Sequence, residues 1–220
     1  MIAKGVLILE GNYINGKKDG KFKEYNEKGK LIFEGEYLNG EKNGFIKEYD
    51  SYGELIFEGE YLKGKKNGKI KEFRSYSHNL IFDGEYLTDK RWNGKGKEYN
   101  NLNILIYEGE YLNGERNGQS KVYYDDGDIL FEGEYINGKW NGKGKEYFKR
   151  GKIKYDGNFL DGKYSGNGKE YYQCGNVKYV GEFLDGKYSG KGKEYFKNGK
   201  IKNSGEYLKG KIKDKKKWII

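Results

Sequence analysis

The amino-acid sequence predicts an all-β fold, an elongated single-layer antiparallel sheet of about nine tandem β-hairpins. The string FEGEYLNGEKNG at residues 33–44 comes back in closely similar form at Phe57, Tyr107 and Phe131. Asn-Gly or Asp-Gly dipeptides separate short segments of alternating character, and such dipeptides are the strongest short-range signal of a hairpin turn. Proline is absent from the 220 residues, which favours a continuous strand ladder because proline removes a ladder hydrogen bond.

One glycine recurs at a fixed interval along the chain. It is the glycine of the GEY motif or of a close variant, and successive copies are 24 or 25 residues apart. A fixed period in the twenties is typical of repeat proteins, whose units bury their apolar surface by stacking on neighbours. We therefore predict a single array over residues 1–220 whose last unit ends in a Lys-rich cap. Its units are expected to begin near Gly5, Gly29, Gly53, His78, Asn103, Gly127, Gly151, Gly175 and Gly199.

Each unit is predicted to form two strands joined by a tight turn, as at Asn15-Gly16 and Asn39-Gly40. Alternation puts the aromatic residues and the glycine of FEGEY on one face and the glutamates on the other. The rings can then cover the bare glycine backbone, which accounts for 23 Tyr and 11 Phe in the chain. The glycines between units belong to further turns. His78 and Asn103 replace two of them, because His and Asn tolerate the left-handed conformation better than most residues.

Two units in the middle of the chain carry one extra residue each. One lies in RSYSHNL, residues 74–80, and the other in LTDKRWNG, residues 87–94, where Thr88-Asp89 replaces the usual Asn-Gly. We interpret both as lengthened connections. Lengthened loops in a strict array are frequent partner-binding positions, and loops also tolerate insertions that have no function. Both interpretations stay open.

The residue types that carry most enzyme chemistry are scarce. The chain holds one histidine, His78, and one cysteine, Cys174, which argues against zinc sites and His-based triads. Carboxylates do occur in pairs, such as Glu34 with Glu36, but they recur in nearly every unit. A catalytic pair instead needs one special environment that separates two pKa values. We therefore expect a solvated, salt-bridged face, no enzyme activity and no cofactor or metal.

The formal charge of +9 is concentrated near the C-terminal end. Residues 209–217 hold six Lys and one Asp and contribute +5 of it, so the rest is nearly balanced and no nucleic-acid partner is expected. A Lys cluster followed by Trp218 suits an anionic lipid surface. Lys residues also protect terminal strands from edge-to-edge pairing, and this interpretation stays open. The candidate lipid-binding residues are Lys211, Lys213, Lys215, Lys216, Lys217 and Trp218.

The repeating unit resembles the MORN repeat (membrane occupation and recognition nexus) over essentially the whole chain. The resemblance rests on FEGEY at 33–37 followed by Gly40 and Gly44, and on FEGEYINGKWNGKG at 131–144. Many members carry Trp where this chain has Tyr37, and an aromatic residue where it has Glu48. The glutamate resembles the bacterial-type MORN variant. The resemblance implies a hairpin array used for scaffolding, protein association and, in some members, contact with anionic membranes, without catalysis by the repeats.

We therefore expect a non-enzymatic scaffold or protein-protein interaction module. A protein is the expected partner, peripheral binding to anionic phospholipid membranes is the alternative, and edge-to-edge homo-oligomers are a further option. No secretory signal and no apolar run of about 20 residues is visible, so we expect a cytoplasmic protein, with membrane association left open. The candidate partner-binding residues form an exposed strip of Tyr37, Tyr61, Tyr86, Tyr111 and Tyr135 together with Arg91 and Trp92.

Overall fold

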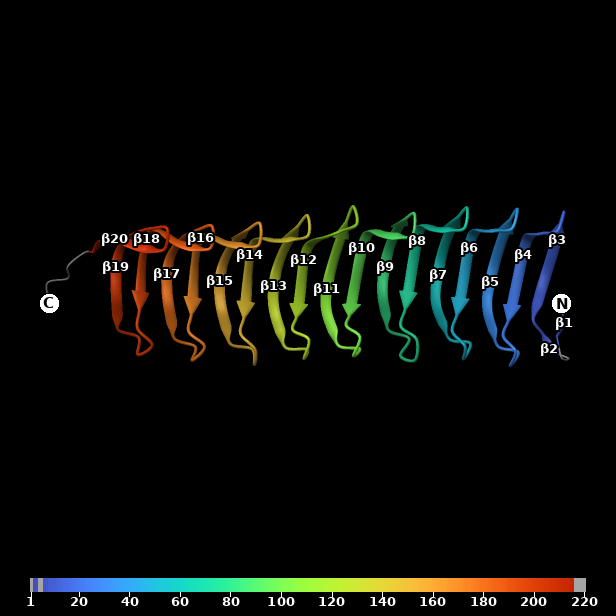
Figure 1. Ribbon diagram of the computed structural model, residues 1–220, viewed down its shortest axis with the longest axis horizontal. Helices are drawn as coiled ribbons and strands as arrows, with labels where there is room; N and C mark the ends of the chain where they lie inside the picture. The colour runs from blue at the N-terminus through green and yellow to red at the C-terminus, as the bar shows by residue number, and fades with distance from the viewer. Residues whose placement is uncertain (1, 4–5, 216–220) are drawn as a thin grey trace. The chain divides into compact units, whose positions relative to one another are not determined.

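The computed structural model describes residues 2–3 and 6–215, and every regular element in this part of the chain is a β-strand (Figure 1). The chain divides into two compact units, residues 1–96 with 111–114 and residues 97–110 with 115–220. The first unit contains β1 (Ile2–Ala3), β2 (Val6–Leu7), β3 (Leu9–Ile14), β4 (Lys17–Tyr25), β5 (Leu31–Leu38), β6 (Glu41–Tyr49), β7 (Leu55–Leu62), β8 (Lys65–Phe73) and β9 (Leu80–Leu87).

The boundary between the units passes through β10 (Lys90–Tyr99) and β11 (Leu105–Leu112). The second unit contains β12 (Glu115–Tyr123), β13 (Ile129–Ile136), β14 (Lys139–Tyr147), β15 (Ile153–Leu160), β16 (Lys163–Tyr171), β17 (Val177–Leu184), β18 (Lys187–Tyr195), β19 (Ile201–Leu208) and β20 (Lys211–Lys215). From β3 to β10 and from β12 to β20, consecutive strands pair antiparallel, which gives an open meander of hairpins, and β1 pairs with β2 in a separate hairpin. The predicted all-β class and tandem hairpins are thus confirmed.

Two-residue turns close the hairpins at the predicted dipeptides. Asn15 and Gly16 have φ values of 49° and 75°, and two positive φ angles in succession match a type I′ turn, whose twist suits the flanking strands. Thr88 and Asp89 adopt the same conformation without glycine, with φ of 52° and 66°. The turns between hairpins also behave as predicted, since His78 and Asn103 have φ of 53° and 68°.

The aromatic rings share one face of the sheet, as the alternation predicts, and that face is the buried one. Phe33 and Phe57 are buried, and Glu36 and Leu38 point to solvent from the other face. The expected covering of strand glycines by rings holds at Gly157, where a Cβ would lie 2.7 Å from Cζ of Tyr155. At Gly35 and Gly59 the side chains of Ile46 and Ile70 take that place. The aliphatic side chains come from the facing strands.

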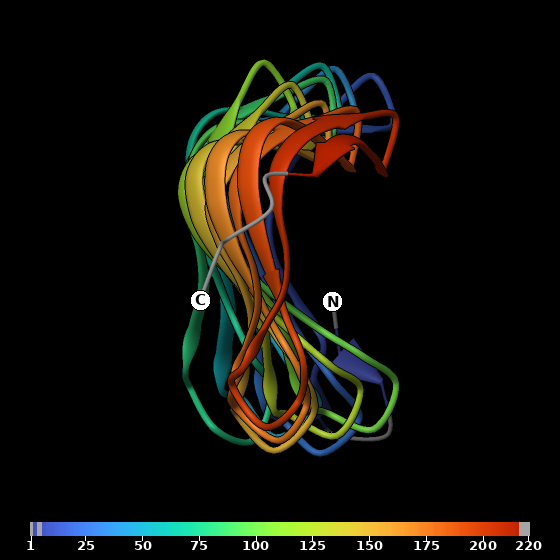
Figure 2. The same cartoon turned by 90° about the vertical axis from the view of Figure 1, so that its left-hand side faces the viewer.

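Regular bulges interrupt the ladders and reset the alternation. In β13 and β14 the pairing passes from Gly133–Gly144 to Glu134–Asn141, so the second strand holds extra residues against the first. A bulge bends its strand, and Figure 2 shows individual strands curving along their length. The bulge therefore decides which side chains of the second strand face the core.

The two irregular segments differ in kind. Between β8 and β9 the connection is residues 74–79, one residue longer than the 26–30 connection, as predicted. The second prediction is wrong, because the turn at Thr88-Asp89 keeps its two residues. The pairing of β10 with β9 instead shifts between Arg91 and Asn93. The extra residue is therefore Trp92, which forms a bulge inside the strand where ladder pairing absorbs it.

Candidate binding surfaces

The candidate partner-binding tyrosines lie mostly in the core. Only 9% of the Tyr61 surface and 5% of the Tyr135 surface are exposed, Tyr86 and Tyr111 are buried to a similar degree, and Tyr37 is half-buried. The expectation of an exposed aromatic strip is therefore wrong for these rings. Tyr61, Tyr86 and Tyr135 pack edge-on against the aromatic residue four positions earlier, as Tyr61 does on Phe57 at 5.4 Å between centroids. Tyr37 contacts Phe33 at a tilt of 47°. A partner-binding role for them stays a prediction.

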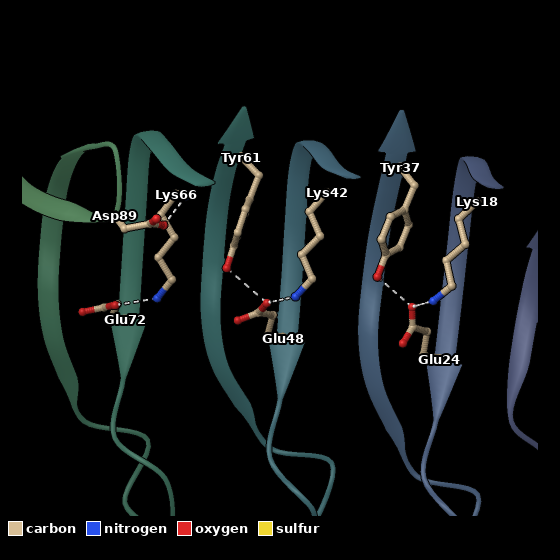
Figure 3. A network of polar contacts seen from close by, with 9 residues as sticks. All are labelled: Lys18, Glu24, Tyr37, Lys42, Glu48, Tyr61, Lys66, Glu72 and Asp89. Atoms are coloured by element: carbon tan, nitrogen blue, oxygen red, sulfur yellow. Dashed lines mark hydrogen bonds and ion pairs between the residues drawn. The ribbon is translucent and has the colours of Figure 1, made fainter. Parts of the chain in front are cut away.

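A carboxylate accompanies Tyr37, Tyr61 and Tyr86 in the first unit. The hydroxyl of Tyr37 donates to Glu24 Oε1 at 2.8 Å, and Lys18 Nζ lies 2.6 Å from the same oxygen. Figure 3 shows this arrangement at Glu24 and again at Glu48, with Lys66 repeating the ion pair at Glu72. The glutamate comes from the second strand of one hairpin and the tyrosine from the first strand of the next. The contact therefore joins neighbouring repeats.

Glu24, Glu48 and Glu72 occupy the same position in successive hairpins, and we call the glutamates at this position the ionic row. Glu72 has the largest number of partners among these three. Its carboxylate accepts hydrogen bonds from Lys66 Nζ and Tyr86 Oη, both at 2.9 Å, and from Arg91 at 3.2 Å. Burial opposes ionisation, but the hydrogen bonds and the charge of Lys66 outweigh it and lower the pKa of Glu72. Burial, followed by the charge of Glu72, raises the pKa of Tyr86 to about 12. The site is thus a neutralised ionic cluster.

The second unit builds the same row with different residues. The position of Lys18 is occupied by Tyr164 and Tyr188 in later repeats, and their rings stack on Tyr155 and Tyr179 at 3.7 and 3.8 Å. Tyr164 donates to Glu146 at 2.5 Å. The cation now comes from the following strand, where Lys154 lies 2.7 Å from Glu146.

One repeat lacks the carboxylate altogether. Val122 stands where the other second strands have glutamate, and Leu130 stands where later repeats have the lysine. The neighbouring Tyr135 hydroxyl is instead reached by the indole N–H of Trp140 at 2.6 Å. The carboxylate and the lysine of the following strand are absent together, and Arg116, at the position of Lys18 in this repeat, pairs with Glu98 instead. The row therefore avoids an unpaired charge on the half-buried face.

This row of glutamates was not predicted from the sequence. The signal was present as a correlated exchange between repeats. Repeats with Lys at 18, 42 and 66 have Ile at 32, 56 and 81 in the following strand, whereas repeats with Tyr at 164 and 188 have Lys at 178 and 202 there. Such an exchange indicates that the two positions serve one shared neighbour, because either can supply the positive charge.

The opposite face carries the carboxylate pairs that the sequence analysis assigned to solvent. Glu34 lies 3.5 Å from Lys23, and Glu108 lies 3.2 Å from Lys97, so the inner member of each pair takes part in cross-strand ion pairs. No Lys, Arg or His nitrogen in the described part of the first unit lies within 4 Å of the carboxylates of Glu36, Glu60 or Glu85.

An exposed aliphatic residue closes the first strand of every hairpin on this face. In the first unit Leu38 is 53% exposed, Leu62 53% and Leu87 46%. Ile14 and Leu112 occupy the same position in the flanking hairpins of that unit. The second unit continues the pattern with Ile136, Leu160, Leu184 and Leu208. These four side chains make up most of the exposed large apolar residues of the second unit.

The remaining candidate residues are distributed over different places. Arg91 lies over the Phe82 ring at 4.9 Å and contacts Glu72, so it is a partner of the ionic row, and Trp92 is half-buried. Lys211 and Lys213 are exposed at the end of the second unit. Lys215 ends β20, and Lys216, Lys217 and Trp218 lie outside the described residues.

The single histidine and cysteine sit in turns. The imidazole Nε2 of His78 contacts the Glu54 carboxylate, and Cys174 is an exposed free thiol. Among the described residues, no group of three or more His, Cys, Asp or Glu side chains is arranged to hold a metal ion. The same part of the chain contains no helix long and apolar enough to cross a membrane.

These surfaces belong to a β-hairpin repeat protein. The family model for the MORN repeat matches residues 10–21, 33–45, 57–69, 107–129, 131–153, 155–177 and 179–201. The chain therefore belongs to the MORN repeat family, whose hairpin fold is a typical non-enzymatic repeat module. The matches leave out residues 70–106, which include both irregular segments. No curated protein matches the chain.

Proposed function

We propose that this chain is a non-enzymatic scaffold that binds a protein partner through side chains repeated once per hairpin. The supporting observation is the row of half-exposed aliphatic residues that includes Leu38, Leu62 and Leu87. Single exposed apolar side chains are common on protein surfaces, but these recur at the same position of successive hairpins and so form a regular series of contact points. The aromatic face offers fewer free groups, because its rings, ammonium groups and carboxylates contact one another. A partner that contacts several repeats at once gains affinity from each.

Affinity capture with matched variants tests this proposal. The first variant replaces Leu38, Leu62 and Leu87 with Ser, and the control replaces Lys23 and Lys71 with Ser on the same face. Captured proteins are identified by mass spectrometry, and the affinity of each purified partner is then measured calorimetrically. We expect the leucine variant to lose the partner and the lysine variant to retain it. Equal binding by both variants would contradict a role for the aliphatic row.

Binding to anionic phospholipid membranes is the second candidate. It is supported by the exposure of Lys211 and Lys213 and by the +5 charge of residues 209–217. Each Lys near an anionic surface contributes about 1 kcal/mol. Co-sedimentation with phosphatidylserine vesicles should therefore fall when Lys211 and Lys213 become Gln, and it should fall with added salt. Unchanged sedimentation of that variant would remove this candidate.

We further propose that the protein is cytoplasmic and that its repeats are of the bacterial-type variant. We also propose that it can self-associate through the edges of the sheet. Strand edges in an open sheet present unpaired backbone groups that can pair with another chain. Analytical ultracentrifugation of the full chain distinguishes the cases, because edge pairing gives a mass that rises with concentration. A constant monomer mass over the accessible range would exclude self-association through the strand edges.

A further inference from the structure

Three consecutive hairpins of the first unit place an aliphatic residue and a carboxylate side by side in solvent. The two residues are separated by one position in the first strand, so both point to the same face. All six side chains are exposed. We call this the acidic-aliphatic row, and it consists of Glu36 with Leu38, Glu60 with Leu62 and Glu85 with Leu87.

The carboxylates of this row form no ion pair in the described part of the first unit, although Asn93 donates a hydrogen bond to Glu85 at 3.4 Å. Lys21 and Lys69 are the cross-strand neighbours of Glu36 and Glu85, yet neither forms an ion pair with them among the described residues. The Glu60 side chain leans over the bulge instead, since its Oε2 lies 2.6 Å from where a Cβ of Gly68 would be. The row thus presents negative charge next to apolar surface.

The spacing of the row fits an α-helical partner and does not fit a β-strand. Equivalent residues of successive hairpins are two strands apart, which is about 10 Å at the usual strand spacing. Seven residues of an α-helix advance about 10.5 Å, so a helix lying across the strands keeps one residue per heptad at each leucine. A partner in the β-strand conformation repeats its same-face side chains about every 6.8 Å and falls out of step.

The charges next to the leucines specify which flank of the partner is basic. The inner flank of the row consists of Glu36, Glu60 and Glu85. The outer positions directly opposite the leucines are of mixed sign, because Leu38 faces Glu41 and Leu62 faces Lys65. Positive charge on the partner is therefore favoured along the inner flank alone. An anionic lipid surface is disfavoured there, because the glutamates repel it.

We propose that the acidic-aliphatic row binds an amphipathic helix of a partner protein, with an apolar residue every seventh position and Lys or Arg along one flank. The inference rests on the proposed scaffold function and specifies its partner. The apolar residues of the helix pack between Leu38, Leu62 and Leu87, and its basic flank faces the glutamates. Ile14 and Leu112 allow the apolar contact to extend by one hairpin at each end.

Synthetic helical peptides of about 21 residues, three heptads, test the proposal by fluorescence anisotropy with the full chain. The first peptide has Leu once per heptad and Lys on one flank. The second has the same composition with the Leu spacing scrambled, and the third has Glu in place of Lys. We expect binding of the first peptide, and binding at least tenfold weaker for the other two.

Matched protein variants locate the contact. Replacing Glu36, Glu60 and Glu85 with Gln should weaken binding about tenfold, as expected for three exposed charge pairs. The control replaces Glu34 and Glu58 with Gln and Asp83 with Asn. It removes the same number of negative charges from the same strands, two residues farther from the leucines. It should change binding less than twofold. Circular dichroism melts of both variants verify that each remains folded.

Several results would overturn the inference. Equal weakening by the two charge variants would indicate unspecific attraction, and equal binding of the scrambled peptide would remove the spacing argument. Adsorption to phosphatidylserine vesicles that is lost when Leu38, Leu62 and Leu87 become Ser would assign the row to lipid. A captured protein that needs these leucines but binds through a strand or loop would refute the helix and leave the scaffold function intact.

Discussion

The ionic row on the aromatic face leads to a prediction about coupling between Glu170 and Lys178. Lys178 Nζ lies 2.8 Å from Glu170 Oε1, and the side chains are 36% and 16% exposed, respectively. The Tyr188 hydroxyl donates to the other carboxylate oxygen at 2.5 Å. The chain itself contains the uncharged alternative, because Val122 and Leu130 occupy the same positions two repeats earlier. The perturbation is therefore Glu170→Val, Lys178→Leu and the double variant.

The magnitudes follow from burial and partners. Removing Lys178 leaves a carboxylate that is largely buried with one hydroxyl donor, and removing one partner of a fully buried pair costs about 3–5 kcal/mol. Partial exposure reduces this to about 2 kcal/mol. Removing Glu170 leaves the Tyr188 hydroxyl without its acceptor, at about 1–2 kcal/mol, while Lys178 can extend toward water. The double variant avoids the unpaired charge, so we expect a coupling energy of about 1–2 kcal/mol.

The assay is urea denaturation of all four proteins at neutral pH, supplemented by hydrogen exchange in β16 to β18 because repeat arrays can unfold locally. The control cycle is Lys163 with Asp185, which have a similar separation of 2.7 Å but are far more exposed. We expect its coupling to fall within experimental error. If the Glu170–Lys178 coupling is no larger than that of the control, the reasoning about the ionic row is wrong.

Three further predictions concern packing, hydrogen bonding and pH. Gly157→Ala should cost about 2–3 kcal/mol by overpacking, because its Cβ would lie 2.7 Å from the backbone of the facing strand. Gly151→Ala lies at an open turn and should cost about 1 kcal/mol in backbone strain. Equal urea midpoints for the two variants would refute this difference. Tyr164→Phe should lose about 1–2 kcal/mol with its hydrogen bond to Glu146, measured in the same way, and an unchanged midpoint would contradict it. The pKa of Glu72 is lowered in the folded protein, so its contribution to stability is present above the unfolded pKa of about 4.3 and is lost as pH falls below it. Glu72→Gln should therefore flatten the acid limb of the stability curve, and a parallel curve would refute that assignment.

Local chemistry accounts for what the sequence predicted well. The hairpin turns depend on the conformational preferences of adjacent residues such as Asn15 and Gly16, and those preferences act within a few residues. The left-handed conformation of His78 follows from the same local rule. The 24-residue period and the alternation of aromatic residues with glutamate are likewise readable without any knowledge of which strand pairs with which.

Strand register decided the features that the sequence did not predict. The extra residue at Trp92 could lengthen a turn or bulge a strand, and only the pairing of β10 with β9 shows the bulge. The tyrosines were expected in solvent, because alternation shows which residues share a face of the sheet but not whether that face is buried. Glu24 and Glu36 are both glutamates in alternating segments, yet Glu24 is partnered by Tyr37 and Lys18, while Glu36 is exposed to solvent.

The sequence by itself therefore determined the repeat, the hairpins, their turns and the family, because each depends on residues close together in the chain. The tertiary structure decided which carboxylates are neutralised, which rings are buried and which leucines remain exposed. Those properties depend on contacts between residues of neighbouring repeats, and a one-residue bulge exchanges the two faces of a strand. The exposed row from which we infer a helical partner is one of the features set in this way.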